Sequence, residues 1–403
     1  AVPRRWKDRT ALPLFIPPLL TREEHTVSSV LHGRDAASLL NAGGREGELF
    51  AHGLAAQALI ESGVPALSAY DGLLTDATSH WNRIRERGIS PTALETYARC
   101  PFQYFSAQVL DLDAVRQTVS MELSPPAMGQ LCHDALRLCY LALIRQGWGT
   151  AASSAAVVTA EVTRAVTQAF TVYAMTHGTG YALTWQLAQD TVRHLVEAMV
   201  RFDCEAAAAS GFIPVECEID AQGILPDGTA GEAIPLRGRW DRLDRHPVSG
   251  ALRVIDYKYR ANDRIDAKDR QLLQAAVRAQ RLQPALYTLM AVDGPGEQPH
   301  GPQPEQVEFL YLLPQGMPMV ERASFPASCW QGPSGPMLSR TVQLLVDGIR
   351  SGRHFIVPDT AHCDHCEFAT ACRKAHQPSL WRTRRSSLAG ALRALRFEKV
   401  ARD

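Results

Sequence analysis

The stretch ALRVIDYKY at 251–259 holds the residues whose types and spacing point most directly to chemistry. In a strand, side chains alternate, so Asp256 and Lys258 would share one face with the Tyr257 carbonyl between them. Such a carboxylate can hold a hard divalent cation, and the ammonium can orient an attacking water and offset phosphate charge. The alternative interpretation is an ion pair at a strand end, so neighbouring residues must decide between the two.

The preceding stretch GRWDRLDR supplies a second carboxylate, joined to the first through the turn HPVSG. Asp241 can then meet Asp256 across a hairpin. Asp244 competes for this role, with a strand-end charge as its alternative; Asp241 is preferred because alternation puts it opposite Leu236 and Trp240. Two carboxylates and a lysine in this order are typical of a metal nuclease, in which Mg²⁺ polarises the scissile phosphate and lowers the pKa of bound water.

The cysteines give an independent signal. Cys363, Cys366 and Cys372 follow the pattern C-x2-C-x5-C, which is tight enough for three thiolates to converge on one metal centre. A fourth ligand is needed, and His362 or His365 could provide it in a zinc site. The remaining cysteines, apart from the one before Pro101, are expected to be packed thiols: Cys132, Cys139, Cys204, Cys217 and Cys329.

The pair GRWDRLDR and VIDYK resembles motifs of the PD-(D/E)XK nuclease superfamily, in the branch that contains the RecB and AddB nuclease domains and the CRISPR adaptation nucleases. The resemblance implies a histidine after a glycine on a helix upstream of the sheet, and MGQLCHDAL supplies His133. By resemblance His133 is a metal ligand together with Asp241, Asp256 and the Tyr257 carbonyl. Standing alone, such a histidine would more often lie on a helix surface.

The family also carries a glutamine and a tyrosine four residues apart on the helix after the D-x-K strand. Gln283 and Tyr287 in LQPALY match, and this spacing puts both on one helix face, where they can reach the active site or a DNA phosphate. The alternative is ordinary helix packing. Pro284 between them is expected to kink the helix.

AddB-type nucleases have a cysteine just before Pro-Phe, with three more near the C-terminus, and Cys100 in YARCPF fits the first position. The resemblance implies that Cys100 joins Cys363, Cys366 and Cys372 in a [4Fe-4S] cluster that staples the ends of the nuclease domain together. Zinc is the main rival because four thiolates suit it equally well. The match at all four positions favours iron–sulfur.

The elements that must position these residues follow a helix-to-strand-to-helix order. Apolar spacing predicts helices over 126–210, three short strands, a helix, and one more strand. The later elements are expected at 212–219, 234–245, 251–259, 269–292 and 306–313, followed by a helix in MLSRTVQLLVDGIRSG. This order and the resemblance imply an α/β fold: a restriction-endonuclease-like mixed central sheet (αβββαβ core) flanked by helices, with a helical insertion and the iron–sulfur staple.

Three regions are expected along the 403 residues: an accessory or connecting region at 1–88, the nuclease domain at 89–378 and a basic tail at 379–403. The first region contains one helical stretch, around ELFAHGLAAQALIESG. YDGLL (70–74) resembles the stretch upstream of the first cysteine in AddB. The chain is therefore interpreted either as the end of a larger helicase-nuclease or as a stand-alone relative.

Charge does not identify a partner, because 42 Lys and Arg residues balance 42 Asp and Glu residues. DNA binding would have to come from local arginines. Nine basic residues follow Cys372, and this tail either lies along phosphates or docks on the domain. Arg239 and Arg242 are expected to face solvent or phosphate, and Trp240 and Tyr259 either stack on a base or pack in the core. No apolar run is long enough to cross a membrane, and a cytoplasmic setting is expected.

Two functions follow. The first is a Mg²⁺- or Mn²⁺-dependent DNase, expected to act as an exonuclease on linear or single-stranded DNA ends in repair, recombination or foreign-DNA processing. In it, Lys258 positions the attacking water, and Gln283 and Tyr287 support the site. The second is a catalytically silent DNA-binding or scaffold subunit of a helicase-nuclease complex. The first is favoured because no motif carboxylate and no motif lysine is missing.

Overall fold

The computed structural model describes residues 45–61, 63–64, 66–113, 123–225, 233–261, 269–292, 301–315, 319–358 and 360–400. The Pro-rich run at 11–20 and most of the N-terminal accessory region therefore lie outside the described residues. By its contacts the chain divides into two compact units, Ala1–Ala66 and Leu67–Asp403. Helix α4, Arg45–Glu61, belongs to the first unit and coincides with the expected helical stretch. The expected boundary near residue 88 stays a prediction.

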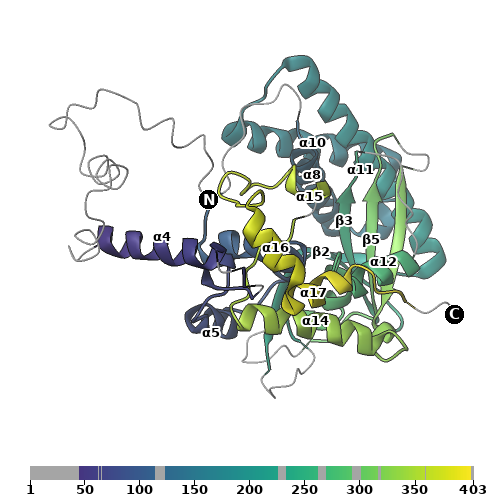
Figure 1. Ribbon diagram of the computed structural model, residues 1–403. Helices are drawn as coiled ribbons and strands as arrows, with labels where there is room; N and C mark the ends of the chain where they lie inside the picture. The colour runs from purple at the N-terminus through teal and green to yellow at the C-terminus, as the bar shows by residue number, and fades with distance from the viewer. Residues whose placement is uncertain are drawn as a thin grey trace. The chain divides into compact units, whose positions relative to one another are not determined.

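The second unit is built on a mixed sheet of six described strands in the order β4-β1-β2-β3-β5-β6 (Figure 1). The strands are β1 Ile213–Ile224, β2 Pro235–Arg245, β3 Leu252–Tyr259, β4 Met290–Val292, β5 Gln306–Leu312 and β6 Val320–Pro326. The first three form the expected antiparallel meander, whereas β3 and β5 run parallel. A parallel pair needs a crossover, and the helical segment between β3 and β5 provides it. The expected α/β fold with a mixed sheet is confirmed.

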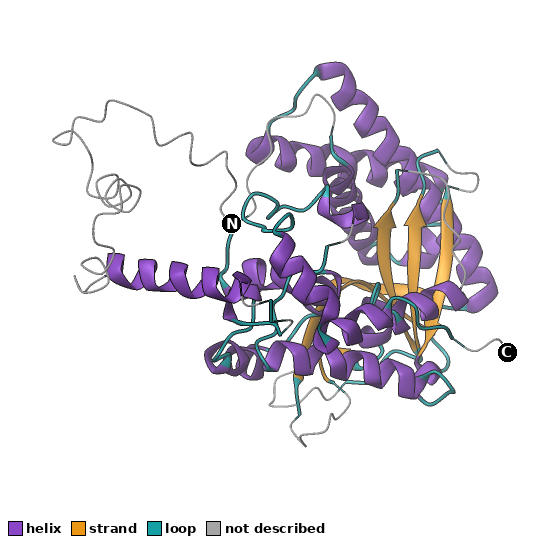
Figure 2. Ribbon diagram, in the orientation of Figure 1, coloured by secondary structure: helices purple, strands orange, loops and turns teal. Residues whose placement is uncertain are grey.

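Helices cover both faces of this sheet (Figure 2). Before the sheet come α5 Thr78–Arg87, α6 Pro91–Arg99, α7 Pro101–Tyr104, the π-helical turn η4 Phe105–Val109, α8 Pro125–Arg145, α9 Trp148–Ala151, α10 Ala155–His177 and α11 Ala182–Ser210. After β3 come α12 Asp269–Val277, α13 Gln283–Tyr287, the short turn η5 Ala327–Trp330, α14 Gly335–Arg350, α15 Thr360–Cys363, α16 Gln377–Arg385 and α17 Ser387–Leu395. A further short turn, η3 Ala69–Asp71, precedes α5.

Two apolar cores separate these helices by sheet face. Val254 of β3 and Phe309 of β5 lie in a core with α5, α6, α12, α14 and α17. The adjacent Ile255 and Leu310 lie in the other core, with α8, α10 and α11. The sequence of a strand that is buried on both faces is a continuous apolar run and does not alternate between apolar and polar residues. The order of these residues along β3 and β5 therefore explains why both strands lie at the centre of the sheet.

The helix expected over 269–292 is not continuous. Helix α12 ends at Val277, and Ala279 then adopts a left-handed backbone with φ 56°. Pro284 stands in the first turn of the new helix α13, where a missing N–H costs nothing, instead of kinking a long helix. The last residues of the expected helix form β4, because Met290 and its neighbours pair with β1.

Ser90 caps α6 by accepting from the Ala93 N–H at 3.1 Å, and Pro91 occupies the first turn. Strand β6 was not expected from the sequence, and its alternating burial shows an edge strand with one side in the core. None of the helices in the described part of the chain has the length and apolar character needed to span a bilayer.

Candidate active site

The D-x-K residues of β3 form a buried ion pair. Lys258 Nζ lies 2.7 Å from Asp256 Oδ2, and the Asp256 side chain is only 4% exposed. Burial raises the pKa of Asp256 to about 6; the charge of Lys258 opposes this effect, and the nearby carboxylate of Asp241 adds to it. Two carboxylates in a dry site repel each other, so this pair is a site where a further cation would be favoured.

Asp241 reaches the same place from β2. The last ladder pair between β2 and β3 joins Arg242 to Ile255, which brings the next residues of both strands, the two aspartates, opposite each other. The Tyr257 N–H donates to Asp241 Oδ2 at 2.8 Å. Burial disfavours the charge of Asp241, but hydrogen bonds from its neighbours outweigh burial and lower its pKa. Asp241 is therefore the more readily ionised member of the carboxylate pair.

His133 joins the cluster from α8. Its Nδ1 lies 3.3 Å from Asp241 Oδ2, and its Nε2 lies 2.9 Å from the Tyr257 carbonyl oxygen. Burial opposes protonation, yet the hydrogen bond and charge of Asp241 raise the pKa of His133 to about 9. When both ring nitrogens are protonated, the ring donates one N–H to each oxygen. His133 thus contacts two of the other predicted donors, Asp241 and the Tyr257 carbonyl, and the fourth, Asp256, lies opposite Asp241 on the neighbouring strand.

Donor chemistry at this point suits a hard divalent ion, because oxygen ligands predominate. Among the described residues, however, no three His, Cys, Asp or Glu side chains stand at the spacing of a metal site. The side chains instead pair with each other, His133 with Asp241 and Lys258 with Asp256. A bound cation would have to displace these pairs.

Helix α13 supports the lysine. Lys258 Nζ donates to Gln283 Oε1 at 2.7 Å, and Gln283 Nε2 donates to the Tyr287 hydroxyl at 3.3 Å. That hydroxyl in turn donates to the carbonyl of Arg239 on β2 at 3.2 Å. Burial opposes the charge of Lys258, but Asp256 and then Asp241 raise its pKa, so the ammonium remains charged. Gln283 and Tyr287 therefore connect the lysine to the neighbouring strand, as their spacing on one helix face predicted.

Glu95 on α6 was missed by the sequence analysis. Its Oε1 accepts the backbone N–H groups of Leu282 and Gln283, at 2.6 and 2.9 Å, and so holds the first turn of α13 in place. Burial raises the pKa of Glu95, although the charge of Lys258 partly offsets this effect. No spacing rule links α6 to a helix almost two hundred positions later, so the sequence carried no signal for this contact.

The four predicted cysteines influence one another electrostatically. Cys100 is the buried residue between α6 and α7, Cys363 ends α15, and Cys366 and Cys372 follow in the next loop. The pKa of Cys372 is raised to about 11, mainly by burial and in part by the charges of Cys100, Cys366 and Cys363. The absence of a metal-site spacing among the described His, Cys, Asp and Glu side chains applies to these thiols as well. His365 is exposed. None of the nine cysteines forms a disulfide, and of the five expected to be packed, Cys132, Cys139 and Cys217 are buried.

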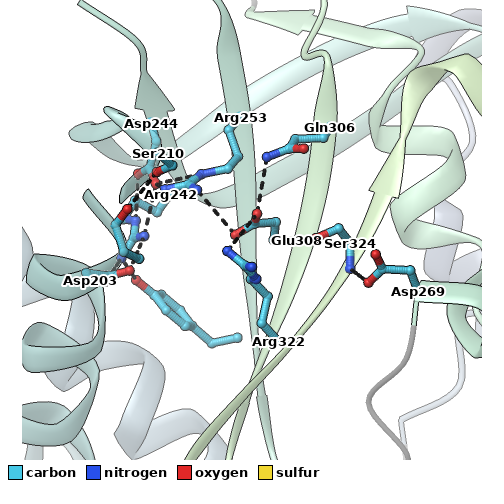
Figure 3. A network of polar contacts seen from close by, with 12 residues as sticks. Asp203, Ser210, Arg242, Asp244, Arg253, Asp269, Gln306, Glu308, Arg322 and Ser324 are labelled. Carbon is cyan, nitrogen blue, oxygen red and sulfur yellow. Dashed lines mark hydrogen bonds and ion pairs between the residues drawn. The ribbon is translucent and has the colours of Figure 1, made fainter. Parts of the chain in front are cut away.

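The expectation that Arg242 faces solvent or phosphate is wrong. Its side chain is fully buried between α11 and the sheet (Figure 3), where it donates to Asp203 Oδ2 at 2.6 Å and to Asp244 Oδ1 at 2.8 Å. It also donates to the Tyr257 hydroxyl at 2.9 Å and lies over the Tyr140 ring at 4.6 Å. A charged group of this size is tolerated in the interior only when paired, so the two aspartates explain its position.

The network extends across the sheet. Asp244 Oδ2 accepts from Arg253 at 2.7 Å, and Arg253 lies 3.5 Å from Glu308 of β5 (Figure 3). Asp244, the rejected alternative to Asp241, is therefore a buried structural partner rather than a strand-end charge. Because Tyr257 has its hydroxyl in this network and its carbonyl in the His133 cluster, the network fixes one wall of the candidate site.

Of the other residues predicted to contact DNA, some are buried and others are exposed. Trp240 is fully buried, so it packs in the core, whereas Arg239 is exposed and pairs with Glu218 at 2.9 Å. In the tail, Arg382 is buried against Asp71 at 2.7 Å, and α17 buries Leu392 in the core. The tail is thus docked on the domain, with its other described basic side chains exposed or half-buried.

Fold and site together define a class. Residues 88–373 match the model of the PD-(D/E)XK nuclease superfamily. The chain belongs to this superfamily, which confirms the resemblance seen in the sequence motifs.

Similar curated proteins carry a more specific name than that of the superfamily. An ATP-dependent helicase/deoxyribonuclease subunit from Moorella thermoacetica is 32% identical over 181 residues, which is 42% of this chain and 15% of the relative. Proteins of the same name from Desulfitobacterium hafniense and Bacillus subtilis are 31% and 28% identical, over 42% of this chain and 14% and 15% of their own length. The match therefore spans about one seventh of these relatives. A solved structure, "Crystal structure of SSO0001", covers 70% of this chain and 94% of its own with TM-score 0.25 and 10% identity, and no argument rests on it.

Proposed function

We propose that this chain is a divalent-metal-dependent deoxyribonuclease that hydrolyses phosphodiester bonds by in-line attack of water, and that it works as an exonuclease on linear or single-stranded DNA ends in repair or in processing foreign DNA. One observation carries the proposal: Asp241, Asp256, His133 and the Tyr257 carbonyl meet beside Lys258. Membership of the nuclease superfamily supports the same conclusion.

Asp241, Asp256, His133 and the Tyr257 carbonyl would hold Mg²⁺ or Mn²⁺. When bound, the ion would polarise the scissile phosphate and lower the pKa of its water. The protein's own part is positioning. Asp256 and Gln283 hold the Lys258 ammonium from two sides, at 2.7 Å each, so that its charge can face the attacking water and the phosphate.

The test is cleavage of end-labelled single- and double-stranded DNA, with and without Mn²⁺. Asp256→Asn and Lys258→Ala should each abolish divalent-dependent cleavage while the circular dichroism spectrum stays that of the parent. Asp134→Asn is the matched control, because Asp134 is a half-buried carboxylate next to His133 that makes only a 4.0 Å ion pair with Arg137. Cleavage by Asp256→Asn at the parental rate would refute the assignment. DNA binding without any cleavage would support a silent scaffold role instead.

We also propose that Cys100, Cys363, Cys366 and Cys372 bind a [4Fe-4S] cluster that joins the start of the nuclease domain to its C-terminal region. The mutual charge effects of the four thiols support the donor set. Anaerobic purification should give a brown protein with broad visible absorption, and Cys366→Ser should remove the colour. Cys329→Ser is the control, because Cys329 lies apart from the four. A colourless parent protein that contains zinc would refute the assignment of an iron–sulfur cluster.

The names of the relatives suggest a partner. These proteins are named as subunits of ATP-dependent helicase/deoxyribonucleases, and we propose that this chain likewise works beside a helicase or a helicase-like region. Co-purification of the full chain with a helicase, followed by measurement of ATP-dependent DNA degradation, tests this proposal.

A further inference from the structure

A pocket of about 150 Å³ opens beside α6, α12 and α17. This volume is several times what one water molecule needs, so a single tetrahedral anion fits within it. The polar lining consists of Glu95, Arg99, Arg278, Gln280 and Arg396. Three guanidinium groups thus face one carboxylate, and the pocket carries an excess of positive charge.

Two of these arginines are held by the backbone. Arg278 Nε donates to the carbonyl of Glu398 at 2.9 Å, and Arg396 Nη2 donates to the carbonyl of Arg99 at 3.0 Å. A guanidinium has five N–H donors, so the bond to Glu398 orients the Arg278 group without exhausting it. Arginine heads fixed in this way lose little entropy when they bind an anion, and their planar fork matches phosphate oxygens.

The carboxylate of Glu95 only partly offsets the positive charge of the three arginines. Its Oε1 already accepts two backbone N–H groups at the start of α13. Glu95 therefore forms the wall between the pocket and α13, whose Gln283 accepts from Lys258 at 2.7 Å. Through this short chain of contacts the pocket is next to the proposed catalytic lysine.

The pocket floor has an unusual backbone. Ala279, which is 3% exposed, has a left-handed φ of 56°, a conformation that a residue with a Cβ rarely adopts. The Gln280 N–H bonds the Ala275 carbonyl at 2.8 Å and closes this turn. The turn at Ala279 brings both Arg278 and Gln280 into the lining of the pocket. The strained backbone of Ala279 is therefore linked to the shape of the pocket.

We propose that this pocket is a phosphate subsite that binds one backbone phosphate of the DNA strand, next to the linkage held at Lys258. The inference rests on the proposed nuclease function and names how its substrate is held. Arg99, Arg278 and Arg396 bind the phosphate oxygens, and Gln280 can donate its amide N–H. The role is binding and register, because none of these groups reaches the reacting atoms.

Binding of a fluorescent single-stranded oligonucleotide, measured by anisotropy in EDTA at several KCl concentrations, tests the subsite without cleavage. Losing one phosphate contact lowers the slope of log K against log salt by about 0.7, which is about fivefold in affinity at 0.1 M. Arg99→Gln and Arg278→Gln should each show this loss. Arg201→Gln, an exposed arginine of α11, should bind as the parent does.

A second measurement isolates the phosphate itself. A neutral methylphosphonate placed at successive positions should weaken binding by the parent most at one position, and that penalty should disappear in Arg99→Gln. Binding by both variants equal to the parent, or no position-dependent penalty, would overturn the subsite. The nuclease proposal fails separately: if Asp256→Asn cuts like the parent while Arg99→Gln still loses affinity, the pocket stands and the catalytic assignment falls.

Discussion

Replacing Arg242 by methionine gives the strongest test of the buried network beneath the candidate site. The substitution keeps an unbranched apolar stem but removes the guanidinium, which donates to both Asp203 and Asp244. Asp244 keeps its bonds from Arg253, whereas Asp203 loses its cationic partner in an environment where its side chain is 5% exposed.

Breaking a buried pair by removing one partner costs about 3–5 kcal/mol, because an uncompensated charge is left behind. We expect the free energy of unfolding to fall by this amount in urea titrations followed by circular dichroism. Arg239→Met is the matched control on the same strand. The Arg239 side chain is 60% exposed, so its loss should cost no more than about 1 kcal/mol.

The double variant Asp203→Asn with Arg242→Met separates the pair from simple loss of packing. Neutralising the stranded carboxylate should recover part of the stability, so the two substitutions together should cost less than the sum of the single ones. A loss below about 1 kcal/mol in Arg242→Met, or full additivity in the double variant, would refute the reasoning that the pair is a compensated buried charge.

Three further outcomes are expected. Gln283→Ala should slow DNA cleavage, because the lysine loses one of its two holds, while DNA affinity in EDTA stays that of the parent; an unchanged cleavage rate would contradict the positioning role. Burial lowers the pKa of His354 to about 4, below its unfolded value, so its contribution is complete above about pH 6.5 and is lost as pH falls towards 4. His354→Phe should therefore flatten the acid side of the stability profile, and exposed His194→Phe should not. Gly348→Ala should destabilise the fold by about 1–3 kcal/mol, because an added Cβ would meet the Tyr97 hydroxyl; a melting temperature equal to the parent's would show that Tyr97 can move away.

The strand and helix pattern could be predicted from the sequence where local signals dominate. The meander of β1, β2 and β3 follows from β-forming residues between turn residues, and the start of α6 follows from Ser90 and Pro91. The break after α12 could not, because its helical spacing continues through Ala279 and only tertiary packing imposes the left-handed turn there.

The candidate site divides in the same way. Asp256 and Lys258 could be placed together from strand alternation alone, since they are two positions apart on one strand. Glu95 and Arg242 could not, because each owes its position to partners distant in sequence, Leu282 in the first case and Asp203 in the second. From the sequence alone, an arginine in a half-polar strand is expected to face solvent. Its burial can be predicted only when the carboxylate that pairs with it is known.

The contact between Asp71 and Arg382 joins positions 311 apart in the chain, and that between Glu95 and Leu282 joins positions 187 apart. Contacts at such separations form late, since the loop between them must close first. On the ribosome, a nascent chain that has reached only β3 already contains both aspartates but lacks the α13 segment that holds the lysine. The topology thus delays the assembly of the candidate site until the crossover after β3 has been made.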